Sequence, residues 1–222
     1  MRRRLVRRRL DRQRIVESAL RILDRSADSA LTMRALAEDL GVTAMALYKY
    51  FPSKEALLDA VADRALGEIV VPSPRREDWI ARSRALAVSF HRVLRRHPAL
   101  APLLAREPAL GRSALRLYEA ALEILRGSGL EDRRLVAAYG ALYSYTLGFT
   151  VVQVARRGAA AARRRVDAAA RRQGLDEKQA RLLHDLRPRT GRYSDEQFEF
   201  GLDLLLAGLA ERARQRRRPA RG

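Results

Sequence analysis

The helical spacing of apolar residues along almost the whole chain constrains its fold more than any other feature. Apolar residues recur three and four positions apart, and no convincing run alternates apolar with polar residues as a half-buried strand would. The sequence therefore predicts an all-α protein, with helices at about residues 11–25, 33–40, 44–51, 54–69, 79–97, 99–106, 110–126, 135–155 and 194–214.

One proline-rich stretch divides this helical pattern. VVPSPRRED, at residues 70–78, carries two prolines and is the best candidate for a domain boundary. We expect four parts along the chain: a basic arm at 1–10, a three-helix domain at 11–70, a helical bundle at 75–214 and a basic tail at 215–222. The alanine- and arginine-rich segment 156–173 fits either a solvated helix or a mobile loop.

Two short helices joined at Gly41 form the pattern of a helix-turn-helix motif. Apolar residues on their facing sides must meet across the turn: Leu36, Ala37, Leu40, Val42, Leu47 and Phe51. Gly41 gives the backbone the freedom that the turn requires, and Thr43 is placed to cap the second helix. The outward face then carries Ala44, Met45, Tyr48 and Lys49. Such a short helix can enter the major groove of DNA, which is roughly 12 Å wide.

The charge balance also indicates an anionic partner. The 222 residues include 45 Lys and Arg against 26 Asp and Glu, a net charge of +19. The alternative is a codon-composition bias toward arginine, because only three of the 45 cations are lysine. Six arginines of the N-terminal arm fit a minor-groove or phosphate-tracking extension, or else a solvated tail: Arg2, Arg3, Arg4, Arg7, Arg8 and Arg9. We interpret the C-terminal run Arg212–Arg221 as solvated.

Several classes of site are absent from the sequence. There is no cysteine, and His91, His97 and His184 show no paired ligand spacing, so we expect no metal site and no cofactor. No constellation of catalytic residues is present, and the N-terminus lacks a secretory h-region, which favours the cytoplasm. Leu135–Ala155 is uncharged and long enough to span a bilayer, but its hydroxyl and amide groups favour burial inside protein over a membrane.

The stretch LTMRALAEDLGVTAMALYKYFPSKEALLDAV closely resembles the DNA-binding domain of the tetracycline-repressor (TetR) family. The LGV turn, the LYKYF helix and SKEALL carry the resemblance, which with the first helix covers about residues 11–70. The second half is similar in helix order and in the TLG at 146–148, and it looks most like the branch of the tetracycline repressors themselves. The resemblance implies an all-α homodimer that binds a palindromic operator, usually as a repressor released by a ligand.

The resemblance also implies roles for individual residues. Arg34 would read a base, and five residues would hold phosphates: Thr32, Thr43, Tyr48, Tyr50 and Lys54. The alternative for Tyr50 is a half-buried aromatic side chain. Ala44 and Met45 stand where family members vary their base contacts, and being apolar they can only touch thymine methyl groups or set the closeness of approach.

The sequence of the second domain favours a homodimer and an apolar or aromatic effector. Helices at 194–214 and around 135–155 are more apolar than one core requires, and Gly201 and Gly208 would let helices approach closely. The stretch ALAPLLAR at 99–106 lacks the histidine that completes the magnesium shell in tetracycline-binding members. We expect the effector pocket to be lined by Phe90, His91, Leu103, Leu104, Leu117, Tyr118, Tyr139, Tyr143, Thr146, Phe149, Thr150 and Gln153, which alternatively form bundle and dimer core.

The leading hypothesis is therefore a ligand-responsive transcriptional repressor with three partners: operator DNA, a second copy of itself and a small-molecule effector. A second hypothesis is a DNA-binding regulator without an inducer, acting as an activator or a constitutive binder. A third, from another class, is an enzyme or a peripheral membrane protein built on the second domain.

Overall fold

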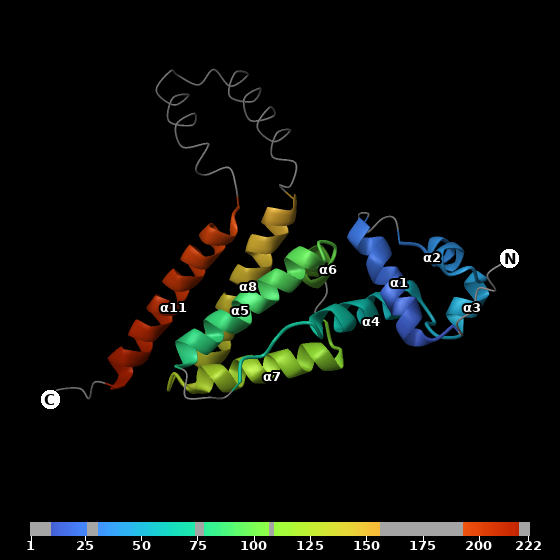
Figure 1. Ribbon diagram of the computed structural model, residues 1–222. Helices are drawn as coiled ribbons and strands as arrows, with labels where there is room; N and C mark the ends of the chain where they lie inside the picture. The colour runs from blue at the N-terminus through green and yellow to red at the C-terminus, as the bar shows by residue number, and fades with distance from the viewer. Residues whose placement is uncertain (1–9, 26–30, 74–77, 107–108, 156–192, 218–222) are drawn as a thin grey trace, which may run out of the picture. The chain divides into compact units, whose positions relative to one another are not determined.

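The computed structural model describes residues 10–25, 31–73, 78–106, 109–155 and 193–217, and these contain helices and no strand. The all-α prediction is confirmed. The helices are α1 (Arg12–Arg25), α2 (Met33–Leu40), α3 (Ala44–Tyr48), α4 (Lys54–Leu66), α5 (Trp79–Arg96), α6 (Leu100–Arg106), α7 (Arg112–Arg126), α8 (Asp132–Ala155) and α11 (Asp195–Arg217) (Figure 1). The basic arm before Leu10, the alanine- and arginine-rich segment 156–173, His184 and the last five residues lie outside the described residues.

The chain forms two compact units, each of which takes two stretches of sequence. The first unit combines residues 1–69 with 96–119, and the second combines 70–95 with 120–222. The prolines at 70–78 lie where the chain first passes from one unit to the other. Residues 96–119, which lie inside the predicted bundle at 75–214, are grouped by their contacts with residues 1–69.

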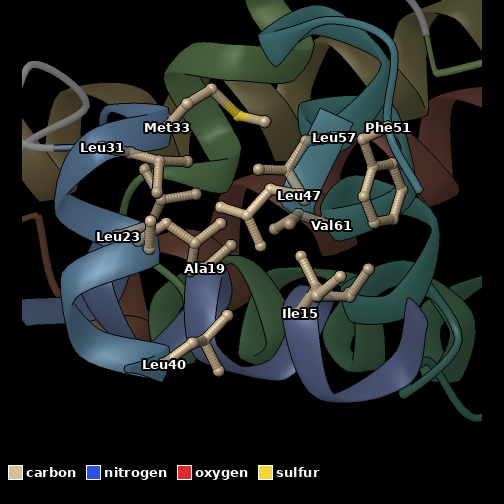
Figure 2. Close-up of a cluster of buried hydrophobic side chains, with 13 residues drawn as sticks. Ile15, Ala19, Leu23, Leu31, Met33, Leu40, Leu47, Phe51, Leu57 and Val61 are labelled. Carbon is tan, nitrogen blue, oxygen red and sulfur yellow. The ribbon is translucent and has the colours of Figure 1, made fainter. Parts of the chain in front are cut away.

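Apolar side chains from α1 to α4 form the core of the first unit. α1 packs against α2 and α4, and α2 packs against α3. The buried side chains of these helices and of the residues beside them point toward one another, and the fully buried ones include Ile15, Ala19, Leu31, Leu47, Phe51 and Leu57 (Figure 2). The apolar residues that the sequence placed across the turn, Leu36 and Leu47 among them, lie in this single cluster.

Local hydrogen bonds set the ends of the short helices. The side-chain oxygens of Thr32, Thr43 and Ser53 accept the backbone N–H groups of the third residue along at the starts of α2, α3 and α4. Gly41 ends α2 in the left-handed region, with φ of 66°, which glycine adopts without the penalty that a Cβ imposes. These caps fix where one helix ends and the next begins, and so fix the turn between α2 and α3.

The second unit is built around the contact between α8 and α11. Phe198, Leu202 and Leu206 of α11 are buried in one cluster with Leu135 and Leu142 of α8. A capping box starts α11: the Ser194 N–H donates to Gln197 Oε1, and the Gln197 N–H donates to Ser194 Oγ.

Gly201 lets α11 approach α8 closely within one chain. A Cβ at this position would lie 2.1 Å from the hydroxyl oxygen of Tyr145, so only glycine fits without a shift. The Tyr145 hydroxyl donates to the Phe198 carbonyl over 3.0 Å and joins the two helices there. The close approach that the sequence predicted for Gly201 is therefore an intramolecular contact.

Among the described helices, α8 alone is long and apolar enough to cross a membrane by length and composition. Core helices meet the same test, and Leu135, Ala138 and Leu142 of α8 lie in the core of the second unit. The hydroxyls of Thr146 and Thr150 donate to the carbonyls four residues back, which satisfies them inside the helix. One side of α8 thus belongs to the core of the second unit, while 28% of its most apolar stretch is buried.

Candidate nucleic-acid interface and effector region

The short helix α3 presents one buried side and one exposed side. Leu47 and the following Phe51 are fully buried in the core of the first unit. On the opposite side, 72% of Met45 and 45% of Tyr48 are exposed, and Lys49 is exposed beside them. Such large apolar and aromatic groups held in solvent by a rigid helix suit a binding surface better than a core.

Ala44 lies differently from the expectation. The sequence placed it on the outward face, but it is half-buried and packs against the core cluster of the first unit. Ala44 is the first residue of α3 and directly follows the Thr43 cap. Met45 is therefore the exposed apolar residue at the start of α3.

Two of the predicted phosphate contacts also cap helices. The hydroxyl oxygens of Thr32 and Thr43 accept backbone N–H groups at 3.0 and 3.3 Å, and both residues are exposed. A hydroxyl that accepts one hydrogen bond keeps its own proton for a second bond. Both threonines can therefore cap a helix and donate to a phosphate oxygen at once. Lys54, also predicted to hold a phosphate, is the half-buried first residue of α4.

Arg34 projects into solvent from the first turn of α2. Its Nε donates to Glu38 Oε1 over 3.1 Å, an ion pair one helical turn apart with both side chains well exposed. Pairs of this kind contribute only about 0.3–0.5 kcal/mol, so the guanidinium can exchange Glu38 for a base edge at small cost.

Tyr50 does not present a free hydroxyl proton to DNA. Its hydroxyl donates to the carbonyl of Leu10 over 2.8 Å, and the residue is half-buried. Its own carbonyl accepts a hydrogen bond from the Arg12 guanidinium, which lies 4.2 Å from the centroid of the Phe51 ring. The structure thus favours the half-buried alternative over a phosphate-donor role for Tyr50. Sequence reasoning missed Arg12 because 38 residues separate it from Tyr50.

A buried histidine joins three parts of the first unit. His97 is 5% exposed; its Nδ1 lies 2.9 Å from Asp24 Oδ2 at the end of α1, and its Nε2 lies 3.2 Å from Glu68 Oε2 just after α4. Arg64 and Arg96 also pair with Glu68, at 2.9 and 3.3 Å. Burial alone would raise the pKa of Glu68, but the hydrogen bond and charge of His97, followed by the two arginines, lower it overall.

In the second unit, the aromatic residues predicted to line the pocket fall into two groups of contacting rings. The rings of Phe90 and Tyr143, and those of Tyr143 and Tyr139, stack with their centroids 5.8 Å apart. His91 stacks on Phe198 at 3.9 Å and meets the edge of Phe149 at 6.1 Å. The first group joins α5 to α8, and the second joins α5 and α8 to α11.

Polar groups at the end of α8 are mostly satisfied within the protein. Burial lowers the pKa of His91, so its imidazole is neutral near pH 7, and Nε2 donates to Gln153 Oε1 over 2.9 Å. Gln153 Nε2 donates in turn to the Tyr193 carbonyl over 2.7 Å. Thr146 and Thr150, predicted to orient a ligand through their hydroxyls, are fully buried and donate to the Leu142 and Thr146 carbonyls.

The remaining predicted lining residues belong to the first unit. Leu104 is buried, Leu117 is half-buried and Tyr118 is exposed. Leu103 borders a small pocket with Leu20, Leu58 and His97. The predicted lining set is therefore divided between the units. Within the described residues, no group of three or more His, Cys, Asp or Glu side chains is arranged to hold a metal ion.

Comparison with known proteins identifies the family. Residues 15–61 match the family described as bacterial regulatory proteins, tetR family, and residues 71–213 match the tetracyclin repressor-like C-terminal domain. The chain is 36% identical over 136 residues to the HTH-type transcriptional repressor DrrR1 of Streptomyces coeruleorubidus, a match that covers 61% of this chain and 50% of that protein.

Two longer matches cover nearly the whole chain. The tetracycline repressor protein class G of Vibrio anguillarum is 31% identical over 208 residues, which are 90% of this chain and 93% of that protein. The crystal structure of ActR from Streptomyces coelicolor in complex with actinorhodin superposes with a TM-score of 0.78 at 28% identity, over 92% of this chain and 99% of that one. Taken with the exposed face of α3, these matches show that the chain belongs to the TetR family of DNA-binding transcriptional regulators.

Proposed function

We propose that this regulator represses transcription by binding a palindromic operator as a homodimer, and that a mostly apolar, aromatic ligand releases it. The observation that carries the proposal is the exposed face of α3, on which Met45, Tyr48 and Lys49 project from a helix fixed by the buried Leu47 and Phe51. A regulator without an inducer shares this face, so only the response to a ligand separates the two hypotheses. Both hypotheses place the protein in the cytoplasm.

Exposed apolar and small residues on α8 and α11 support the homodimer. On α11, 67% of Phe200 and 59% of Leu204 are exposed, and they lie one helical turn apart on the same face as Gly208. On α8, Val136 is exposed and Gly140 lies one turn further, with open space at both Gly140 and Gly208. Two copies that pair these faces would bury the stripes against each other and set the recognition helices about 34–36 Å apart, one DNA turn.

Of the two neighbouring leucines in the middle of α11, Leu204 and Leu205, only Leu204 is exposed enough to lie in a dimer interface. Leu205 packs half-buried against the core of its own chain. Its neighbour Leu204 points outward instead, since successive residues on a helix are rotated by about 100°. We therefore assign the interface to Phe200, Leu204 and Gly208 of α11 with the exposed face of α8.

The aromatic group of the second unit supports an aromatic effector. Stacked rings of Tyr139, Tyr143 and Phe90 offer flat apolar surface, and tyrosine adds hydroxyl groups that can orient a ligand. ActR, which superposes on this chain, was solved with actinorhodin bound. The segment 99–106, which includes α6, contains no histidine. The histidine that completes the magnesium shell in tetracycline-binding members is therefore absent from this segment.

We infer that ligand binding in the second unit shifts α4 and separates the two recognition helices of the dimer. Because coupling between two sites is reciprocal, operator DNA must weaken ligand binding by the same factor by which the ligand weakens DNA binding.

Calorimetric titration tests the effector class and this coupling together. We expect actinorhodin-like aromatic compounds to bind at micromolar or lower Kd, and tetracycline to bind weakly with or without Mg²⁺. Saturating operator should weaken aromatic-ligand binding at least about 10-fold, a coupling of about 1.4 kcal/mol. Tight, Mg²⁺-dependent binding of tetracycline contradicts the effector class, and ligand binding indifferent to operator contradicts the release mechanism.

The DNA-binding role is tested by enriching genomic fragments on the purified protein and measuring Kd for the best fragment and for its scrambled sequence. We expect one palindromic site at which the specific complex is at least about 1,000-fold tighter than the nonspecific one. Binding without sequence preference would contradict the proposed function.

Two substitutions, each measured on variants of the same operator, distinguish a base contact from a phosphate contact. Arg34→Ala should weaken binding by about 1–3 kcal/mol at its preferred base and should flatten the ranking of operator variants, because a bidentate contact to a base edge is lost. Tyr48→Phe removes only one donor and should weaken all variants by a similar factor.

The matched control is Arg126→Ala, which removes an exposed cation from the end of α7 and changes the net charge equally. It should change neither the affinity nor the ranking appreciably. An unchanged ranking for Arg34→Ala would show that Arg34 does not read a base.

A further inference from the structure

We propose that Asp63 is a positioning residue that ties the end of α4 to the start of α7, and that this tie couples operator binding to the state of the second unit. The inference rests on the proposed ligand-released repression and names the contact through which that regulation passes. We call the three residues that form the tie, Asp63, Gly111 and Ser113, the α7 cap.

The start of α7 lacks a capping side chain of its own. Helices α2, α3 and α4 follow Thr32, Thr43 and Ser53, whose side-chain oxygens accept a backbone N–H of the helix. In contrast, α7 follows Gly111, which has no side chain, and its first turn contains no acidic residue. Because the first N–H groups of a helix have no partner within it, α7 needs an acceptor from another element.

Asp63 of α4 provides this acceptor. The Ser113 N–H, at the second position of α7, donates to Asp63 Oδ1 over 2.6 Å, across 50 residues of sequence. An N-cap side chain accepts the same N–H at an ordinary helix start. The carboxylate also lies at the helix end where the macrodipole favours a negative charge. The first turn of α7 is therefore completed by a side chain of α4.

Close packing surrounds this hydrogen bond. A Cβ on Gly111 would lie 2.3 Å from Asp63 Oδ1 and 2.8 Å from Asp63 Cβ, so glycine is what leaves room for the carboxylate. Three residues after Ser113, Arg116 Nη2 donates to the Ile69 carbonyl over 3.4 Å. The end of α4 and the start of α7 thus meet at two polar contacts within the first unit.

The helix α7 begins in the first unit and ends in the second, because the boundary between the units falls after Glu119. Near the end of α7, Leu125 is buried in the core cluster that α8 and α11 share. Val61 of α4 is buried in the same cluster as Leu47 of the recognition helix α3. The α7 cap therefore joins a helix packed in the core behind the recognition helix to a helix that ends in the core of the second unit.

The consequence is a coupling that can be measured from the DNA side. A ligand that moves or orders α7 would act on α4 through Asp63. Because coupling is reciprocal, operator binding that orders α4 must also stabilise the first turn of α7.

Hydrogen–deuterium exchange of the full chain, with and without the selected operator, tests this inference with DNA as the probe. In the unchanged protein we expect the operator to slow exchange of the backbone amides at 112–115 about fivefold, because the cap is open less of the time. Asp63→Ala removes the acceptor, so exchange there should be faster, and the operator should change it less than about 1.5-fold. A cap with a structural role alone would speed exchange equally with and without DNA, and the operator's effect would stay the same.

Three further variants separate the hydrogen bond from other effects of substitution. Asp63→Asn keeps an oxygen acceptor in a side chain of the same size and should keep most of the slowing. Gly111→Ala should lose the slowing, since its methyl group displaces the carboxylate, and it provides the test if Asp63→Ala does not fold. Asp59→Ala is the matched control: it removes an exposed carboxylate one turn earlier on α4 and should behave like the unchanged protein.

Two outcomes would overturn the inference. Slowing of equal size in the unchanged protein and in both Asp63→Ala and Gly111→Ala would show that the coupling bypasses the α7 cap. An operator that does not slow exchange at 112–115 in the unchanged protein would show that α7 does not respond to DNA. Both outcomes leave operator binding intact, whereas a protein that selects no operator contradicts the proposed function itself, and the inference fails with it.

Discussion

Leu204→Glu is expected to convert the homodimer into monomers and to lower operator affinity at least about 100-fold, which corresponds to about 2.7 kcal/mol. Leu204 lies on the exposed stripe of α11 with Phe200 and Gly208, where open space surrounds the glycine. A carboxylate in the middle of that apolar stripe would lose its hydration in the dimer, which disfavours association. A monomer presents one recognition helix to a two-part operator and so loses half of the base contacts.

Sedimentation velocity and operator titration measure the two effects. The matched control is Leu110→Glu, which makes the same change at an exposed leucine between α6 and α7 in the first unit. That variant should remain a dimer and bind with near-normal affinity. A Leu204→Glu protein that still sediments as a dimer and binds the operator would place the interface on another surface.

His97→Ala is expected to lower the free energy of unfolding by about 3 kcal/mol, because it removes buried polar contacts that join parts of the first unit. Both ring nitrogens face carboxylate oxygens, from Asp24 and from Glu68. Ionised carboxylates only accept hydrogen bonds, so both nitrogens must donate if both carboxylates are charged. Removing the ring would leave two partly buried carboxylates facing each other across a cavity, with only Arg64 and Arg96 beside Glu68.

Urea unfolding followed by circular dichroism measures this loss. Arg34→Ala, which breaks the exposed Arg34–Glu38 pair in the same unit, is the control and should change the unfolding free energy by less than about 0.5 kcal/mol. A His97→Ala protein as stable as the unchanged one would show that the histidine contacts add nothing net.

The pH dependence gives a second test of the same junction. Folding lowers the pKa of Glu68 from its usual 4.5, so its contribution is fully present above that value and is lost as the pH falls through the lowered pKa. The difference in unfolding free energy between the unchanged protein and Glu68→Gln should therefore be steady near neutrality and should shrink on acidification below pH 4.5. A difference that does not change with acidity would contradict the ionised state of Glu68.

The sequence by itself determined the helices, the turn and the family. Helical period, the glycine at 41 and the caps at Thr32, Thr43 and Ser53 are local signals, since each involves residues within four positions of one another. The same local pattern predicts which side of α3 faces solvent, because a helix that buries Leu47 and Phe51 must expose Met45 and Tyr48. These features need no knowledge of distant parts of the chain.

Only the tertiary structure decided which distant groups meet. His97 was isolated in the sequence, yet it lies against residues 73 and 29 positions away, and the Tyr50 hydroxyl points to a carbonyl 40 positions away. Packing of α11 on α8 buries part of Leu205 and leaves Leu204 exposed, which the apolar pattern of α11 alone did not distinguish. Helix periodicity fixes which residues share a face, but the packing of one helix on another fixes where that face points.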